Sequence, residues 1–220
     1  MLAQIVLFDG FGPMDVVGPY DVFCAGAMVT GGALEVELVS AEGAREVPGG
    51  VGTLSLRATT GFDPRRADIV VVPGAAGDIP EPGTQPGADS IPAILGRCLE
   101  TPLPGLLKQA LDQPGSIVAA VCGGSTLLSM AGLIQGRCAT TNHLGMDVLE
   151  ATGARPVHAR IVDDGDLVTA GGVTSGLDLG LYLLEREFGP QVALSVEKLF
   201  EFERRGTVWR TAGAAPARQF

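Results

Sequence analysis

The chain has 220 residues, of which 46% are hydrophobic and 18% charged, so it can bury a large core and does not have the composition of a disordered protein. This length suits one α/β domain, and we expect residues 1–205 to form it and 206–220 to be a C-terminal tail. The formal net charge of −10 excludes neither catalysis nor small-molecule binding, but it disfavours nucleic acid and anionic membranes as partners.

Strands and helices alternate along the first part of the chain. A continuous apolar run at 3–8 predicts a strand buried on both faces, and 16–28 has the apolar spacing of a helix, with Asp15 as its N-cap. Strict alternation predicts a strand at 34–39, and glycine punctuation predicts a hairpin at 49–59.

A second buried strand, 68–73, leads into a Gly- and Pro-rich connection at 74–92. Loops of this length in compact domains are usually functional, so we expect a lid or an interface insertion. The remaining pattern predicts, in order, helices 91–99 and 103–111, strand 117–121, helix 123–131, strand 137–141, helix 143–151, strands 157–163 and 166–170, and helices 174–188 and 190–203.

This alternation predicts an α/β fold, a single-domain three-layer sandwich with a mainly parallel sheet. In such sheets ligands bind beyond the carboxyl ends of the strands, where Cys122 and Gly74 lie. The first residues lack a basic leader, and the first apolar run stops at Asp9, so we expect a cytoplasmic protein without a membrane span.

Cys122 is the most informative cysteine. It follows a buried strand and opens a helix, with Ala120 two residues before and Gly124 two residues after it, which is the steric requirement of a nucleophile elbow. A helix N-terminus stabilises a thiolate, so we expect Cys122 to be the only cysteine with a strongly depressed pKa. The alternative is a buried structural cysteine.

The other cysteines carry no such signal. Cys24 and Cys138 fall in a helix and a short strand among apolar residues and are interpreted as small core residues, and Cys98 as an exposed residue without a role. The four cysteines have no CxxC spacing and no paired histidines, which predicts neither a metal site nor a disulfide framework.

Five segments in order resemble the ThiJ/PfpI branch of the class I glutamine amidotransferase-like superfamily, which has a flavodoxin-like fold. They are Met14-Asp15-Val16-Val17-Gly18-Pro19, Val72-Pro73-Gly74-Ala75, Ala120-Val121-Cys122-Gly123-Gly124-Ser125, Ala131-Gly132-Leu133-Ile134-Gln135-Gly136-Arg137 with Ala139-Thr140-Thr141, and Thr169-Ala170-Gly171-Gly172-Val173-Thr174-Ser175-Gly176. The form of the first segment is most similar to the isocyanide hydratases and to the ligand-binding domains of certain AraC-type regulators.

The resemblance implies a homodimeric, cofactor-free enzyme that hydrates a small isocyanide to an N-substituted formamide. In this interpretation Cys122 is the nucleophile, Asp15 is the general acid and base, and a thioimidate forms on the thiol. The backbone N–H groups of Gly74, Ala75 and Gly123 are implied substrate donors. Four residues at and directly after the end of the predicted strand 137–141 are possible pocket residues: Thr140, Thr141, Asn142 and His143.

Two departures keep alternatives open. The hydratase pattern has threonine where this chain has Gly123, and many relatives have histidine where it has Asn142, with His143 next in the chain. Another activity on small electrophiles, such as a cofactor-free glyoxalase, therefore stays possible. So does a sensor domain like that of AraC-type regulators, although a regulator needs about a hundred further residues for DNA binding.

Overall fold

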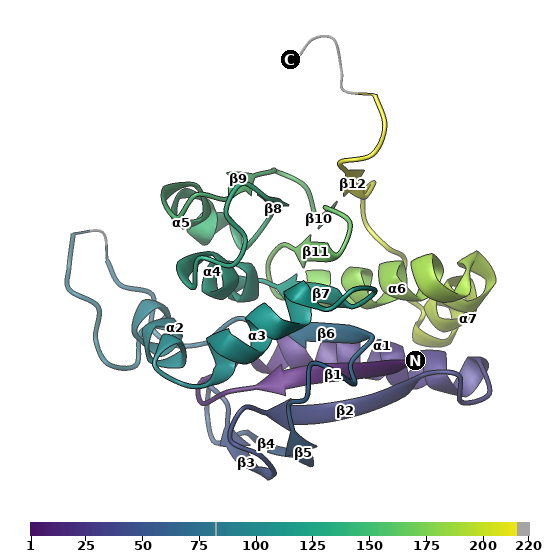
Figure 1. The fold of residues 1–220 in the computed structure, drawn as a ribbon, viewed down its shortest axis with the longest axis horizontal. Coiled ribbons are helices and arrows are strands. Elements are labelled where there is room, and N and C mark those ends of the chain that lie inside the picture. Colours follow the sequence, from purple (N-terminus) through teal and green to yellow (C-terminus); the bar gives the residue numbers. More distant parts are fainter. Residues whose placement is uncertain (82, 215–220) are drawn as a thin grey trace.

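A computed structural model describes residues 1–81 and 83–214. Figure 1 shows a central twisted sheet with helices on both faces. All neighbouring strands in this sheet pair in parallel except β10 and β11, which form an antiparallel hairpin. Within the described residues the strand order is β12 (Trp209–Arg210), β10 (Ile161–Asp163), β11 (Leu167–Ala170), β7 (Ile117–Val121), β6 (Ile69–Val72), β1 (Leu2–Leu7), β2 (Glu35–Ser40) and β5 (Thr60–Gly61).

The helices form two outer layers, which confirms the predicted α/β fold with a mainly parallel sheet (Figure 1). One layer contains α1 (Pro13–Val29), α6 (Ser175–Phe188) and α7 (Pro190–Phe200); the other contains α2 (Ile91–Leu99), α3 (Leu103–Asp112) and α4 (Gly123–Met130), with α5 (Met146–Ala151) packed on α4. Short elements complete the fold: β3 (Arg45–Pro48), β4 (Ser55–Ala58), β8 (Cys138–Ala139), β9 (Arg155–Pro156) and the 3-10 turn His143–Gly145.

Close packing between α1 and α6 depends on residues without side chains. A Cβ on Gly26 of α1 would lie 2.5 Å from a methyl group of Leu184, and a Cβ on Gly180 of α6 would lie 2.9 Å from a methyl group of Val22. The interior strands β1, β6 and β7 are fully buried, as their continuous apolar runs predict.

Several predicted boundaries are wrong. Helix α1 starts at Pro13 with Gly12 as its N-cap, so Asp15 lies inside the first turn and is not the cap. The predicted hairpin at 49–59 is β3 paired with β4 around the turn 49–54. Further along, the strand predicted at 157–163 is only β10, and the helix predicted at 190–203 ends at Phe200.

The predicted tail at 206–220 is partly ordered into the sheet. Trp209 and Arg210 form β12, which pairs in parallel with Val162 and Asp163 of β10. The last part of the tail, 215–220, lies outside the described residues.

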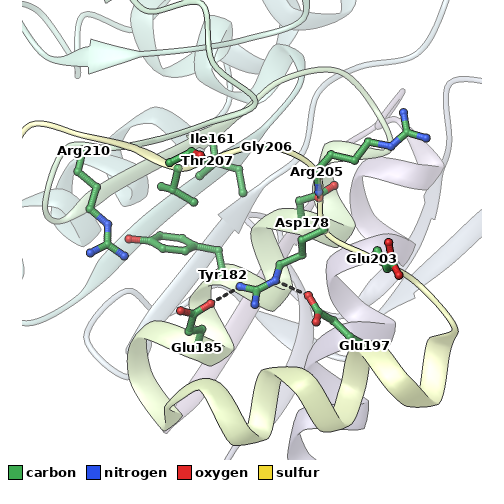
Figure 2. A pocket seen from close by; sticks show the side chains of 12 residues that line it. Ile161, Asp178, Tyr182, Glu185, Glu197, Glu203, Arg205, Gly206, Thr207 and Arg210 are labelled. Atoms are coloured by element: carbon green, nitrogen blue, oxygen red, sulfur yellow. Dashed lines mark hydrogen bonds and ion pairs between the residues drawn. The ribbon is translucent and has the colours of Figure 1, made fainter. Parts of the chain in front are cut away.

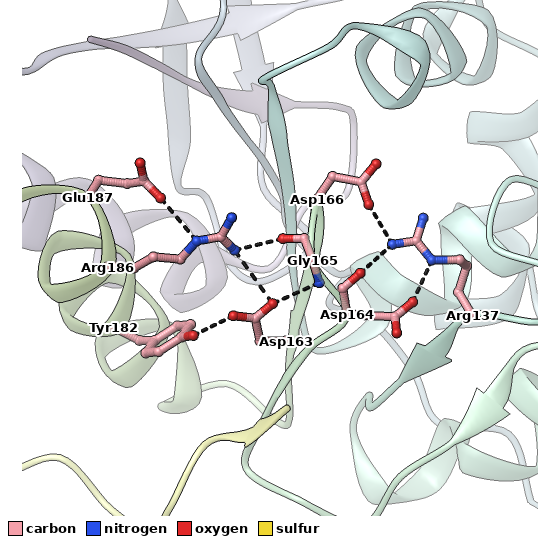
Figure 3. A network of polar contacts seen from close by, with 8 residues as sticks. All are labelled: Arg137, Asp163, Asp164, Gly165, Asp166, Tyr182, Arg186 and Glu187. Atoms are coloured by element: carbon pink, nitrogen blue, oxygen red, sulfur yellow. Dashed lines mark hydrogen bonds and ion pairs between the residues drawn. The ribbon is translucent and has the colours of Figure 1, made fainter. Parts of the chain in front are cut away.

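A polar network holds the β10–β11 turn between two other parts of the fold (Figure 3). The Arg137 guanidinium donates to Asp164 at 2.5 Å and to Asp166 at 2.6 Å. From α6, the Tyr182 hydroxyl donates to Asp163, and Arg186 donates to the Gly165 carbonyl at 2.7 Å. Strand β11 is thereby anchored at its start, and its far end, Ala170, reaches Cys122.

Between β6 and α2, the described residues 74–81 and 83–90 form no helix and no named strand, as predicted, whereas residues 91 and 92 belong to α2. Its ends meet: the Asp78 N–H donates to the Asp89 carbonyl, and the Ile91 N–H donates to the Asp78 carbonyl, both at 3.0 Å. Among the helices in 1–81 and 83–214, none is both long enough and apolar enough to cross a membrane.

Candidate active site

Cys122 occupies a sharp turn between β7 and α4. Its backbone angles, φ 54° and ψ −126°, are outside the regions that a residue with a side chain prefers. The turn lies against the end of β6, because a Cβ on Gly124 would be only 2.1 Å from the Val72 carbonyl oxygen. The predicted nucleophile elbow therefore has the expected strand, turn, helix and small neighbour.

Hydrogen bonds on both sides hold the elbow in this conformation. The Cys122 N–H is shared between the carbonyl oxygens of Ala170 (3.1 Å) and Gly171 (3.0 Å) at the end of β11. The Cys122 carbonyl oxygen accepts from the Thr141 hydroxyl at 2.5 Å and from the Ser125 hydroxyl at 3.1 Å. Strain in the elbow backbone is thus opposed by four contacts to three separate segments.

Asp15 is the buried carboxyl of the site, and its side chain is only 2% exposed. Its Oδ2 accepts a hydrogen bond from the Gly74 N–H at 3.0 Å. Burial raises the pKa of Asp15 to about 7, and the hydrogen bonds from Gly74 and Cys122 only partly offset this effect. A carboxyl group with such a pKa can both accept and release a proton near neutral pH.

The Cys122 thiol is also buried, at 9% exposure. Burial and the neighbouring Asp15 carboxylate raise its pKa, whereas hydrogen bonds from the Val173 N–H, the Gly123 N–H and the Asn142 side chain lower it. The expected strong depression is therefore wrong: desolvation and the like charge outweigh the helix N-terminus. The site holds a neutral thiol next to a carboxyl that can take its proton.

Two of the three predicted substrate donors already have partners inside the site. Gly74 donates to Asp15, and Gly123 donates to the Cys122 thiol. The Ala75 nitrogen is close by, at 3.7 Å from the position of a Cβ on Gly123. This contact places Ala75 at the same end of the sheet as the thiol.

The four possible pocket residues separate into three environments. Thr140 and Thr141 are buried and support the elbow: the Thr140 carbonyl accepts from Ser125 at 2.7 Å, and the Thr141 hydroxyl pairs with Thr126 at 3.0 Å. Asn142 is half-buried, and its side chain lowers the pKa of the Cys122 thiol, whereas His143 is exposed. The structure thus brings Asn142, and not His143, to Cys122.

Val173 is a site residue that the sequence interpretation did not single out. It follows β11 and has φ 25°, and its N–H donates to the Cys122 thiol. Three non-glycine residues in the described ranges have positive φ, and two of them, Val173 and Cys122, meet at the sulfur. The sequence feature that could have indicated this residue is the Gly171-Gly172 pair, which lies directly before it and before a predicted helix start.

The remaining cysteines differ from Cys122 in their surroundings. Cys98 is buried, contrary to the expected exposure, and burial raises its pKa to about 12. Cys24 and Cys138 are partly buried. Across residues 1–81 and 83–214, no group of three His, Cys, Asp or Glu side chains is arranged to hold a metal ion.

A separate cleft of about 590 Å³ lies under the segment 203–210, away from the thiol (Figure 2). Arg204 crosses it and pairs with Glu185 of α6 and Glu197 of α7. The Arg210 guanidinium lies over the Tyr182 ring, 5.3 Å from its centroid. Cys122 and Asp15 do not line this cleft, so it is not part of the elbow site.

The sequence matches a known protein family and its members. The family model described as DJ-1/PfpI family matches residues 86–186. The isonitrile hydratase of Pseudomonas putida is 34% identical over 198 residues, which cover 90% of this chain and 76% of the relative.

Two solved structures have the same fold. A THiJ/PfpI family protein from Pseudomonas syringae has a TM-score of 0.76 at 23% identity, over 93% of this chain and 76% of that one. Drosophila melanogaster DJ-1beta has a TM-score of 0.74 at 20% identity, over 92% of this chain and 98% of that one. Given its elbow cysteine, its buried acidic partner and these matches, the chain belongs to the DJ-1/PfpI family.

Proposed function

We propose that the protein catalyses the cysteine-dependent hydration of a small isocyanide to an N-substituted formamide. The observation that carries this proposal is the pair formed by the Cys122 thiol and the Asp15 carboxyl, whose raised pKa of about 7 suits proton transfer at neutral pH. The similarity to an isonitrile hydratase supports the same substrate class.

The first half of the reaction joins the thiol to the isocyanide carbon. Ionised Asp15 accepts the proton as the S–H bond of Cys122 breaks, and the sulfur forms a bond to the terminal carbon of the isocyanide. Asp15 then gives the proton to that same carbon. The product is a thioimidate, in which the former isocyanide carbon carries one hydrogen, the sulfur and a double bond to nitrogen.

The second half adds water and releases the thiol. Asp15 accepts a proton from water as the water oxygen bonds to the thioimidate carbon, and it passes that proton to the nitrogen. The C–S bond then breaks while the new hydroxyl proton moves through Asp15 to the sulfur. One isocyanide and one water have become one formamide, and both side chains have their starting protonation.

Burial of the pair favours this sequence over simple thiolate attack. Because burial raises the pKa of Cys122, the resting pair keeps the thiol neutral, and negative charge reaches the sulfur only as it forms its bond to the substrate. The proton is moved by a side chain that is already in contact with the sulfur. No metal or organic cofactor enters any step.

The test is product formation with simple isocyanides. Purified protein is incubated with cyclohexyl isocyanide and with an aryl isocyanide, and the formamide is measured by mass spectrometry, with methylglyoxal in a parallel assay for lactate. Formamide that depends on Cys122 and Asp15 supports the proposal. Lactate without formamide would replace it with a glyoxalase, and neither product would favour ligand binding without chemistry.

A further inference from the structure

The Asn142 side chain is fixed by contacts on both of its ends. Its Oδ1 accepts a hydrogen bond from the Leu144 N–H at 3.1 Å, as the cap of the turn His143–Gly145. A backbone N–H can pair only with the oxygen of a carboxamide, so this contact settles which end is which. The Nδ2 amide group must then point the other way.

The Nδ2 end faces the backbone that surrounds the thiol. A Cβ on Gly172 would lie 2.8 Å from Nδ2, so the amide sits where a side chain at 172 would be. Gly172 directly precedes Val173, whose N–H donates to the Cys122 sulfur. The residue before Asn142, Thr141, donates to the Cys122 carbonyl, which brings this segment to the same elbow.

We propose that the Asn142 carboxamide is an uncharged hydrogen-bond donor to the Cys122 sulfur and stabilises the thiolate. The Leu144 N–H orients the carboxamide, and the absence of a side chain at Gly172 leaves room for its Nδ2 group. Its role in turnover rests on the proposed function, since the thiolate is needed when the sulfur attacks the isocyanide and again when it leaves. The Asn142 side chain lowers the pKa of the thiol, as such a donor would, and the N–H groups of Val173 and Gly123 act in the same direction.

This assignment also has a consequence for the proton. A carboxamide neither gains nor loses a proton between pH 4 and pH 10, whereas a histidine at this position could accept the proton of the thiol. With Asn142 beside the sulfur and His143 exposed, Asp15 is the group in this site that can take the proton.

The main test replaces Asn142 with a residue of the same shape. In Asn142→Asp one carboxylate oxygen still accepts from Leu144, so the turn is kept, but the other presents negative charge instead of a donor to the sulfur. Alkylation of Cys122 by iodoacetamide is followed by peptide mass spectrometry between pH 6 and pH 10. We expect the Asn142→Asp rate at pH 7.5 to fall by about tenfold or more, with the midpoint at higher pH.

Matched variants separate the contact from other causes. His143→Asp adds the same charge at the next residue, which is exposed, and should shift the midpoint less than Asn142→Asp does. Gly172→Ala forces Nδ2 away from its place and should raise the midpoint, and adding this change to Asn142→Ala should raise it no further.

The outcomes are distinct because alkylation does not require an isocyanide. Profiles of Asn142→Asp and Asn142→Ala that coincide with wild type, or an equal shift in His143→Asp, would overturn the assignment even if the protein hydrates isocyanides. If the alkylation midpoint shifts only in the Asn142 variants and the protein makes no formamide, the contact is supported and only the proposed function is rejected.

Discussion

Gly74 and Asp15 make a contact that only glycine permits. The Gly74 N–H donates to the Asp15 Oδ2 at 3.0 Å, while a Cβ on Gly74 would lie 2.8 Å from that same oxygen and 2.5 Å from the Gly123 nitrogen. The end of β6 therefore supplies a donor and no side chain, which leaves the carboxyl buried beside the thiol. Burial at this place raises the pKa of Asp15 to about 7, although the Gly74 hydrogen bond lowers it, and this makes the pH dependence predictable.

We predict a bell-shaped pH profile for kcat/KM with isocyanide. Reaction needs one proton on the Asp15–Cys122 pair, so the rate rises as Asp15 ionises near pH 7 and falls at higher pH, when the thiol, whose pKa is raised by burial and by Asp15, also ionises. Initial rates from pH 5 to pH 10 check this. A profile that is flat from pH 5 to pH 8 would exclude Asp15 as the proton acceptor.

Asp15→Asn should be inactive but more stable than wild type above pH 7. The folded-state pKa of Asp15 is raised to about 7, so the folded protein holds a proton that the unfolded chain releases near pH 4, and stability is lost as the pH rises between these values. Asparagine cannot ionise and so removes this loss. The resulting gain in the free energy of unfolding at pH 8 is at most about 4 kcal/mol. Urea unfolding at pH 5 and pH 8 should show a larger gain at pH 8 than at pH 5, whereas an equal gain at both would contradict the burial argument.

Replacing Cys122 by serine should abolish turnover and keep the fold. The hydroxyl is similar in size to the thiol, but Asp15 cannot deprotonate it effectively, so kcat should fall by at least about a hundredfold. The matched control is Cys24→Ser on α1, a partly buried cysteine outside the site, which should retain wild-type kcat. Circular dichroism confirms folding of both, and an active Cys122→Ser enzyme would rule out a covalent intermediate on this residue.

Thr141→Val should destabilise the turn that carries Cys122. It removes the hydroxyl that donates to the Cys122 carbonyl at 2.5 Å and leaves Thr126 without that partner. We expect a loss of about 1–3 kcal/mol in the free energy of unfolding, together with a several-fold lower kcat. The exposed Thr53 offers the same substitution as a control, and equal losses in both variants would mean that the contact does not position the thiol.

Gly123→Thr should raise isocyanide turnover by roughly two- to tenfold, the value of one neutral hydrogen bond. The backbone accepts the change, because a Cβ on Gly123 would meet Gly74 and Ala75 at 3.5 Å and 3.7 Å, which are ordinary contacts. Gly124→Ala is the opposite case, since its Cβ would lie 2.1 Å from the Val72 oxygen, and it should fail to fold. A folded Gly123→Thr enzyme without any gain would argue against the isocyanide assignment.

The sequence predicts the elbow well because its requirements are local. A buried strand, a cysteine and Gly124 are adjacent in the chain, although the contact that excludes a bulkier residue at 124 comes from Val72 at the end of β6. The parallel sheet is predictable for the same reason, since β6 and β7 are unbroken apolar runs and β1 is interrupted only by the buried Gln4.

The electrostatics of the site could not be predicted in this way. The pKa of Cys122 depends on burial and on Asp15, which is over a hundred residues away in the chain, and the local helix N-terminus indicates the wrong direction. The donors from Asn142 and Val173 reach the sulfur only because β11 and the segment after β8 end beside β7. The prediction of Asp15 as N-cap also rests on local sequence alone. In the structure Gly12 is the N-cap, and the Asp15 carboxyl accepts from Gly74 of a different strand end instead.

The backbone angle of 54° at Cys122 determines what selection for heat resistance alone would do to this protein. Glycine adopts such an angle freely, whereas a residue with a side chain loses about 1–3 kcal/mol there. A directed-evolution campaign scored only by survival after heating should therefore favour glycine at position 122 and an amide at position 15. The selected variants would be heat-resistant but inactive, so each round also needs a screen for turnover to retain Cys122 and Asp15.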